Sequence, residues 1–138
     1  MIILDTNVLS ELMRDVPNPT VLDWLDRQPS PSVWVTCISL MEVRYGLLRM
    51  PAGKRRERML EEFETILREE IQGRYAPFDS AAAIQTATLM ARRSLGGRSM
   101  EYRDAMIAGT ALSTKAVLAT RNIAHFSDLS INLANPWE

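Results

Sequence analysis

Apolar residues occur along the chain in two patterns, which predict short strands separated by amphipathic helices. Compact apolar runs bounded by turn residues are typical of buried strands. These runs are 2–4, 33–36, 75–78, 116–119 and 131–133. Apolar residues at helical spacing lie between them, in stretches that follow residue 5, begin at residue 20, and cover 39–49, 54–72, 80–95 and 101–113. Strands that alternate with helices indicate an α/β fold with a parallel sheet and helices on both faces.

Length and composition predict a single domain covering residues 1–138. A chain of 138 residues, 46% hydrophobic and 24% charged, is an ordinary globular protein that can bury about two-thirds of its unfolded surface. We find no repeat, low-complexity segment or linker. No apolar run approaches the roughly 20 residues that span a bilayer, and the first residues lack the basic and long apolar regions of a secretory signal, so we expect none. We therefore expect a cytoplasmic protein without membrane contact.

The composition of polar and charged residues indicates that carboxylates are the candidate catalytic groups. The net charge is −1, so the chain as a whole does not attract nucleic acid. Of its 16 positive side chains all but Lys54 and Lys115 are arginines, whose planar guanidinium suits bidentate contacts with phosphate. One histidine, His125, and one cysteine, Cys37, argue against Ser-His or Cys-His catalysis. Any catalysis would fall to acidic residues.

Asp5 is the first candidate site residue. It stands where the first strand should end, and ligands of open α/β sheets bind at the carboxyl ends of strands. Thr6 and Asn7 follow it and add a hydroxyl and an amide. Asp5 could equally cap the helix that follows, because Asp is favoured at that position.

Glu42 is the second candidate. Its helix is expected to start just after the second strand, so its first turn should lie at the same sheet edge as Asp5. Ser39 precedes Glu42 by three residues, however, and this spacing is also the capping-box pattern. Both interpretations remain open at the level of sequence.

Asp104 is the third candidate, because it shares a helix face with apolar residues at i+3, i+4 and i+7. A carboxylate that faces a core costs several kcal/mol unless it is compensated. An ion pair with Arg103 or Arg121 would compensate it, and so would a cation shared with other carboxylates.

The end of the fourth strand is expected to supply a further group of site residues. Thr120 and Asn122 are neutral oxygen donors, suited to a metal-bound water or a phosphate. Arg121 could contact a phosphate or pair with a surface acid.

The remaining polar candidates are expected to be structural. Asp79 directly precedes a helix and should be its N-cap. Glu101 and Asp128 should lie on the surface. His125, next to Phe126, is expected to be a structural imidazole whose hydrogen bonds are satisfied.

Several carboxylates that converge without cysteine or histidine favour Mg²⁺ or Mn²⁺ over zinc. Such an ion also binds phosphate and can activate water, which points to hydrolysis of a nucleic-acid backbone. Because the carboxylates repel one another, the protein should be more stable with the metal bound.

Five segments, taken in order, resemble the motifs of the PIN-domain ribonucleases, specifically the VapC and FitB-like toxins of bacterial toxin–antitoxin pairs. The segments are 3–11, 39–46, 104–108, 118–122 and 135–137. The resemblance implies a three-layer α/β/α PIN-like domain with a central parallel sheet of four to five strands. It also implies Mg²⁺- or Mn²⁺-dependent endoribonuclease activity on RNA.

The same resemblance assigns roles and partners. Asp5, Glu42 and Asp104 match the metal-binding, catalytic acids of the family. A VapB-type antitoxin is implied as the inhibitor that blocks this site, and family members commonly form homodimers. Many relatives carry a fourth acid within the stretch 120–126, where this chain offers only Asn122 and His125. The number of metal ions is therefore left open.

The sequence leaves three alternatives to a metal-dependent ribonuclease. A PIN domain that has lost catalysis would bind RNA or a partner only. A receiver-like phosphoacceptor needs a lysine near its pocket, and Lys54 and Lys115 lie away from the strand ends. A haloacid-dehalogenase-like phosphatase needs an aspartate two residues after Asp5, where this chain has Asn7.

Overall fold

The centre of the molecule is a five-stranded sheet, seen here in a computed structural model that describes residues 1–138. The strands are β1 (Ile2–Leu4), β2 (Val33–Thr36), β3 (Tyr75–Ala76), β4 (Val117–Ala119) and β5 (Asn132–Ala134). They run in the order β3-β2-β1-β4-β5, and every neighbouring pair is parallel. Strand β3 ends two residues earlier than predicted, because Pro77 has no N–H to donate to a neighbouring strand.

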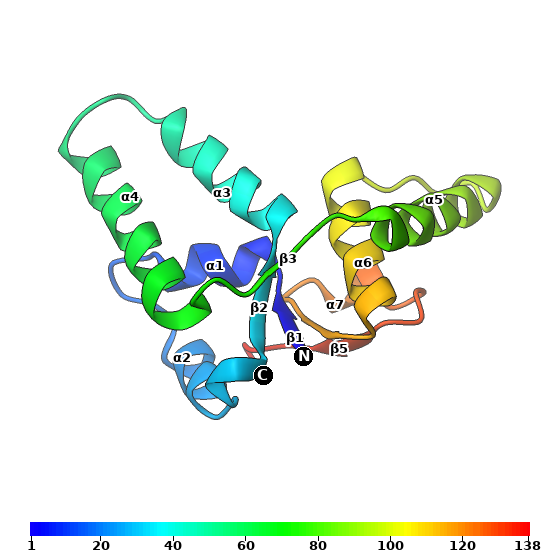
Figure 1. Cartoon of the computed structure of the whole chain (residues 1–138), viewed down its shortest axis with the longest axis horizontal. Helices are drawn as coiled ribbons and strands as arrows, with labels where there is room; N and C mark the ends of the chain where they lie inside the picture. Colours follow the sequence, from blue (N-terminus) through cyan, green and yellow to red (C-terminus); the bar gives the residue numbers. More distant parts are fainter.

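Helices cover both faces of this sheet and make the three-layer α/β/α architecture that was predicted (Figure 1). The helices are α1 (Thr6–Leu12), α2 (Pro19–Asp26), α3 (Cys37–Leu48), α4 (Lys54–Ile66), α5 (Ser80–Leu95), α6 (Tyr102–Thr114) and α7 (Ile123–Phe126). Helices α1 to α4 lie on one side and α5 to α7 on the other. The predicted helix 54–72 ends in a π-helical turn, Leu67–Ile71. No helix combines the length and apolar character needed to cross a lipid bilayer.

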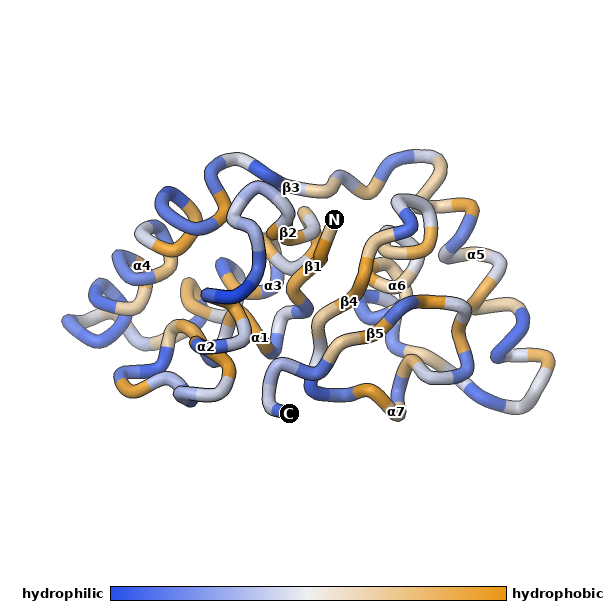
Figure 2. Tube along the Cα trace, turned by 90° about the horizontal axis from the view of Figure 1, so that it is seen from below, coloured by the Kyte–Doolittle hydropathy of each residue, from blue (hydrophilic) through white to orange (hydrophobic).

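Two apolar cores, one on each face of the sheet, explain the continuous apolar runs of the sequence. Successive residues of a strand point to opposite faces. Ile3 therefore joins the core beneath α5 and α6, whereas Leu4 joins the core beneath α1 to α4. Leu118 and Ala119 divide in the same way. Figure 2 shows the strands as a hydrophobic centre between helices, with α4 alternating between apolar and polar residues.

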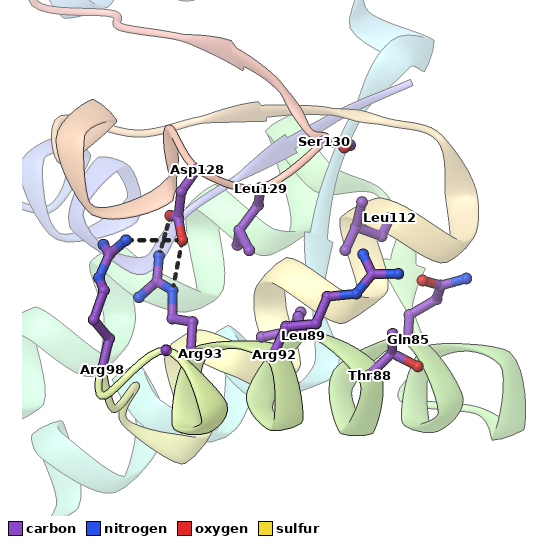
Figure 3. A pocket seen from close by; sticks show the side chains of 11 residues that line it. Gln85, Thr88, Leu89, Arg92, Arg93, Arg98, Leu112, Asp128, Leu129 and Ser130 are labelled. Carbon is purple, nitrogen blue, oxygen red and sulfur yellow. Dashed lines mark hydrogen bonds and ion pairs between the residues drawn. The ribbon is translucent and has the colours of Figure 1, made fainter.

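A buried arginine ties α5 to the segment after α7. The side chain of Arg93 is only 4% exposed and donates to both carboxylate oxygens of Asp128 (Figure 3). It also donates to the backbone carbonyl of His125. The prediction that Asp128 lies on the surface is confirmed, and the structure adds that its carboxylate neutralises a buried guanidinium.

Asp128→Asn is expected to destabilise the protein by about 2–3 kcal/mol at neutral pH, since it leaves the Arg93 guanidinium without its counter-charge. The hydrogen bonds from Arg93 lower the pKa of Asp128 from its ordinary value of 3.8. A carboxyl group with a lowered folded pKa stabilises the protein at higher pH and loses that contribution as the pH falls through the folded pKa. In urea unfolding, the difference between the two proteins should shrink below about pH 4. An unchanged difference at pH 3 would contradict this origin.

Candidate functional site

The predicted site residues gather at the carboxyl edge of the sheet. Backbone hydrogen bonds of 2.9 Å, from Asp5 to the carbonyl of Ala119 and from Thr120 to the carbonyl of Ala134, continue the strand pairing one residue past β1 and β4. Asp5 and Thr120 are therefore side by side. Helix α3 starts directly after β2, between them and the edge strand β3, and it contacts α6 across this edge.

Asp5 is buried, with 4% of its surface exposed, and three donors fix its carboxylate. The Thr6 N–H donates to Oδ1 at 2.8 Å, and the Thr120 hydroxyl donates to Oδ2 at 2.8 Å. The amide of Asn7 adds a longer bond to Oδ2 at 3.3 Å. Asp5 is also the N-cap of α1, so the capping interpretation of this residue is confirmed. Capping uses one oxygen and leaves the carboxylate at the strand end.

Glu42 is free of the capping role that the sequence allowed. The N-cap of α3 is Thr36, whose hydroxyl accepts from the Ser39 N–H at 3.0 Å. Ser39 thus lies inside the helix, and the capping-box interpretation was wrong. The Thr6 hydroxyl instead donates to Oε1 of Glu42 at 3.1 Å and lies 2.9 Å from the Ser39 hydroxyl. Thr6 therefore links Asp5, through its backbone, to Glu42, through its side chain.

Asp104 lies in the first turn of α6, which Glu101 caps. Its side chain is 39% exposed, so it borders the core without being enclosed by it. Neither Arg103 nor Arg121 pairs with Asp104, so of the two alternatives that the sequence left open the ion pair does not hold. Arg103 pairs with Glu101 at 2.9 Å and approaches Glu42 at 3.8 Å, while the Arg121 guanidinium lies over the Trp137 ring, 5.1 Å from its centroid.

The fourth strand end contributes mainly through Thr120. This residue is fully buried, donates to Asp5, and accepts from the Asn7 amide at 3.2 Å and the Asn122 N–H at 3.0 Å. The Asn122 side chain is exposed and makes no hydrogen bond, so it lies outside this network. The Arg121 N–H donates to Asn7 at 3.3 Å, which leaves its guanidinium free to contact a ligand.

His125 is the site residue that sequence reasoning missed. Its Nε2 atom is inaccessible to solvent, has no hydrogen-bond partner, and lies 3.4 Å from Oδ2 of Asp104. The prediction of a satisfied structural imidazole was therefore wrong. The available signal was that this single histidine lies within the 120–126 stretch, which follows a strand at the active edge.

The site carries more negative charge than its surroundings neutralise. Burial raises the pKa of Asp5, and repulsion from Asp104 adds to this, although hydrogen bonds from Thr120 and Thr6 oppose it. Burial likewise raises the pKa of Glu42, against the hydrogen bond from Thr6 and the nearby charge of Arg103. The charge of Asp104 contributes to the raised pKa of both Asp5 and Glu42, so the three carboxylates lie within electrostatic reach of one another. A bound cation would relieve this repulsion.

The donor chemistry fits a hydrated, oxygen-preferring cation. As the side chains stand, no three carboxylate, imidazole or thiol groups are close enough to ligate one ion directly. Mg²⁺ usually retains several waters and is held by only one or two carboxylates, so it does not need a closed protein cage. An open groove of about 640 Å³ runs beside Asp104 and is lined by residues 121–125, Asn135 and Glu138. It offers room for a ligand next to the acids.

A second cavity, of about 300 Å³, contains none of the three acids. It lies between α5 and residues 128–130 and is lined by Arg92, Arg93 and Arg98, among others (Figure 3). The cavity is connected with the acidic edge only indirectly, because Arg93, which lines it, donates to the His125 carbonyl.

Known proteins resemble this chain in both sequence and fold. The PIN domain family model matches residues 2–131. A VapC ribonuclease of Sinorhizobium fredii is 38% identical over 138 residues, covering 100% of this chain and 99% of that protein. The toxin FitB of Neisseria gonorrhoeae is 33% identical over 137 residues, 99% of each chain. The crystal structure of FitAcB from the same organism superimposes with a TM-score of 0.90, covering 100% of this chain and 99% of that one. The DNA-bound VapBC of Salmonella typhimurium has a TM-score of 0.85 at 26% identity, covering 98% and 97%.

Proposed function

This chain belongs to the PIN-domain family, and we propose that it is a metal-dependent endoribonuclease, the VapC-type toxin of a toxin–antitoxin pair. The observation that carries the proposal is the meeting of Asp5, Glu42 and Asp104 at one sheet edge, where the charge of Asp104 helps to raise the pKa of both Asp5 and Glu42. A nuclease is favoured over a phosphatase because the position two residues after Asp5 is Asn7, which is used to hold Asp5 and Thr120.

In this proposal Asp5, Glu42 and Asp104 hold Mg²⁺ or Mn²⁺. When bound, the ion would supply the positive charge that attracts an RNA phosphodiester and polarises water for hydrolysis. Thr6 and Thr120 hold the carboxylates in place through the hydrogen bonds described above. Arg121, prearranged over Trp137 beside the open groove, is suited to contact an RNA phosphate.

A VapB-type antitoxin is the proposed partner, because solved structures of relatives are FitAB and VapBC complexes. We also propose a homodimer. Helix α3 exposes Met41, Tyr45 and Leu48 at helical spacing, and this unpaired apolar face is available to a second copy. A cytoplasmic location fits a protein that cleaves cellular RNA.

Purified protein should cleave RNA with Mg²⁺ or Mn²⁺, lose the activity in EDTA, and regain it when the metal is restored. Expression of the chain alone should arrest growth, and co-expression of the neighbouring gene product should relieve the arrest. EDTA-resistant cleavage would remove the metal from the proposal. Binding of RNA without cleavage under any metal condition would favour a catalytically impaired PIN domain.

A further inference from the structure

The three acids of the site are not held equally. Asp5 accepts three hydrogen bonds and Glu42 accepts one from Thr6 with Arg103 nearby, whereas no donor bonds the Asp104 carboxylate. The Asp104 carboxylate makes one close side-chain contact of opposite polarity, with Nε2 of His125 at 3.4 Å. The imidazole is therefore the group best placed to orient Asp104.

We propose that His125 and Arg93 are positioning residues for the metal site: Arg93 fixes helix α7, and α7 thereby holds the His125 imidazole against Asp104. This inference rests on the proposed function, because it concerns the same acids. It adds two residues to the three acids, and one of them, Arg93, is buried in α5 and lies outside every motif of the chain.

Helix α7 needs external support. It has only four residues, and its N-cap residue, Asn122, makes no capping hydrogen bond with its side chain. Isolated helical turns are unstable in water, because nucleation costs more entropy than one hydrogen bond returns. The position of His125 must therefore be fixed by contacts with other elements.

Arg93 provides the principal polar contact. Its side chain is 4% exposed, and its Nε donates to Asp128 at 3.1 Å, while Nη2 donates to Asp128 and to the His125 carbonyl. One guanidinium thus donates to the backbone of α7 at His125 and to the carboxylate of Asp128 in the segment that follows. Figure 3 shows the contact with Asp128. Arg98 also reaches Asp128, at 3.2 Å, but it is exposed and makes no bond to α7.

The imidazole ring also packs against the ring of Phe126. The two rings meet edge to face, with centroids 4.9 Å apart, and Phe126 is 1% exposed. Backbone and ring are therefore both fixed, while Nε2 is directed toward the carboxylate. Imidazole and carboxylate groups that orient a metal ligand typically change metal affinity or activity by 10–100-fold when they are removed.

Because His125 is the only histidine, its side-chain NMR signals identify themselves. In metal-free protein without RNA, R93K should shift these signals, whereas the control R98K should leave them unchanged. H125A should weaken Mn²⁺ binding, titrated directly, by about tenfold and lower kcat with little change in KM for RNA. Unchanged imidazole signals in R93K, or unchanged Mn²⁺ affinity in H125A, would overturn the proposal.

A double variant separates positioning from stability. If Arg93 acts through His125, R93K should reduce Mn²⁺ affinity in the wild-type background and have no further effect on it in H125A, while its effect on unfolding is the same in both. An equal effect on metal affinity in both backgrounds would overturn the role of Arg93. Should R93K fail to fold, D128N loosens the same contact and serves in its place. Failure of the wild type to cleave RNA would count against the proposed function alone, since the imidazole and metal titrations contain no RNA.

Discussion

Asp5→Asn is expected to lower RNA cleavage by more than about a hundredfold while the fold is kept. The substitution preserves the side-chain shape, and the amide oxygen can still accept from the Thr6 N–H that caps α1. It removes the negative charge that the site presents to a cation. Cleavage of a labelled RNA, measured with saturating Mn²⁺ alongside circular dichroism, provides the test.

The matched control is Asp79→Asn. Asp79 also precedes a helix and caps it, through the Ala82 N–H at 2.9 Å, but no hydrogen bond or ion pair links it to the three acids. This variant should retain wild-type cleavage. Equal activity of Asp5→Asn and wild type would rule out Asp5 as a catalytic group.

The free energy of unfolding of Asp5→Asn should show how much the buried negative charge of Asp5 destabilises the metal-free protein. Burial raises the pKa of Asp5, so its ionisation destabilises the folded, metal-free protein as the pH rises through the folded pKa. At neutral pH the variant should therefore unfold at an equal or higher urea concentration than the wild type. Added Mg²⁺ should stabilise the wild type more than the variant.

Local patterns in the sequence were sufficient to predict the architecture and the edge on which the site is built. Strand runs, helix spacing and the position of Asp5 after β1 depend on neighbouring residues, and the structure confirms them apart from shifted ends such as that of β3. The same local logic failed at α3. Thr36 and Ser39 are both good caps, and only the observed start of the helix decides between them.

The features that could not be predicted depend on residues far apart in the chain. Arg93 and Asp128 are separated by 35 positions, and nothing near either residue indicates that the arginine is buried. His125 and Asp104 meet for a similar reason, because the placement of α7 depends on that same arginine. Asp5 and its donors Thr6, Asn7 and Thr120 are recognisable from sequence, whereas the contact between Asp104 and His125 is not.

Gly109→Ala is expected to destabilise the protein by about 3 kcal/mol, because α5 and α6 approach each other too closely for a methyl group. A Cβ at Gly109 would lie 1.9 Å from the Thr86 hydroxyl and 2.9 Å from two backbone atoms of α5, the Ala82 carbonyl oxygen and the Thr86 nitrogen. The Thr86 side chain can rotate away from the added methyl group. The close contacts with the two backbone atoms can be relieved only if the helices move apart. Urea unfolding should show the loss directly.

Gly46→Ala is the matched control, since Gly46 is also inside a helix but has no atom within 4 Å of the added Cβ. Alanine has the higher helix propensity, so this variant should gain about 0.5–1 kcal/mol. Adding Thr86→Ala to Gly109→Ala removes the hydroxyl contact and leaves both backbone contacts, so it should restore only part of the stability. Full recovery would show that the hydroxyl alone keeps α6 at its distance, and a neutral Gly109→Ala would show that the two helices can separate without cost. Asp104 lies in the first turn of α6, the helix that Gly109 allows to pack closely against α5. Gly109→Ala should therefore also weaken Mn²⁺ binding, whereas Gly46→Ala should not.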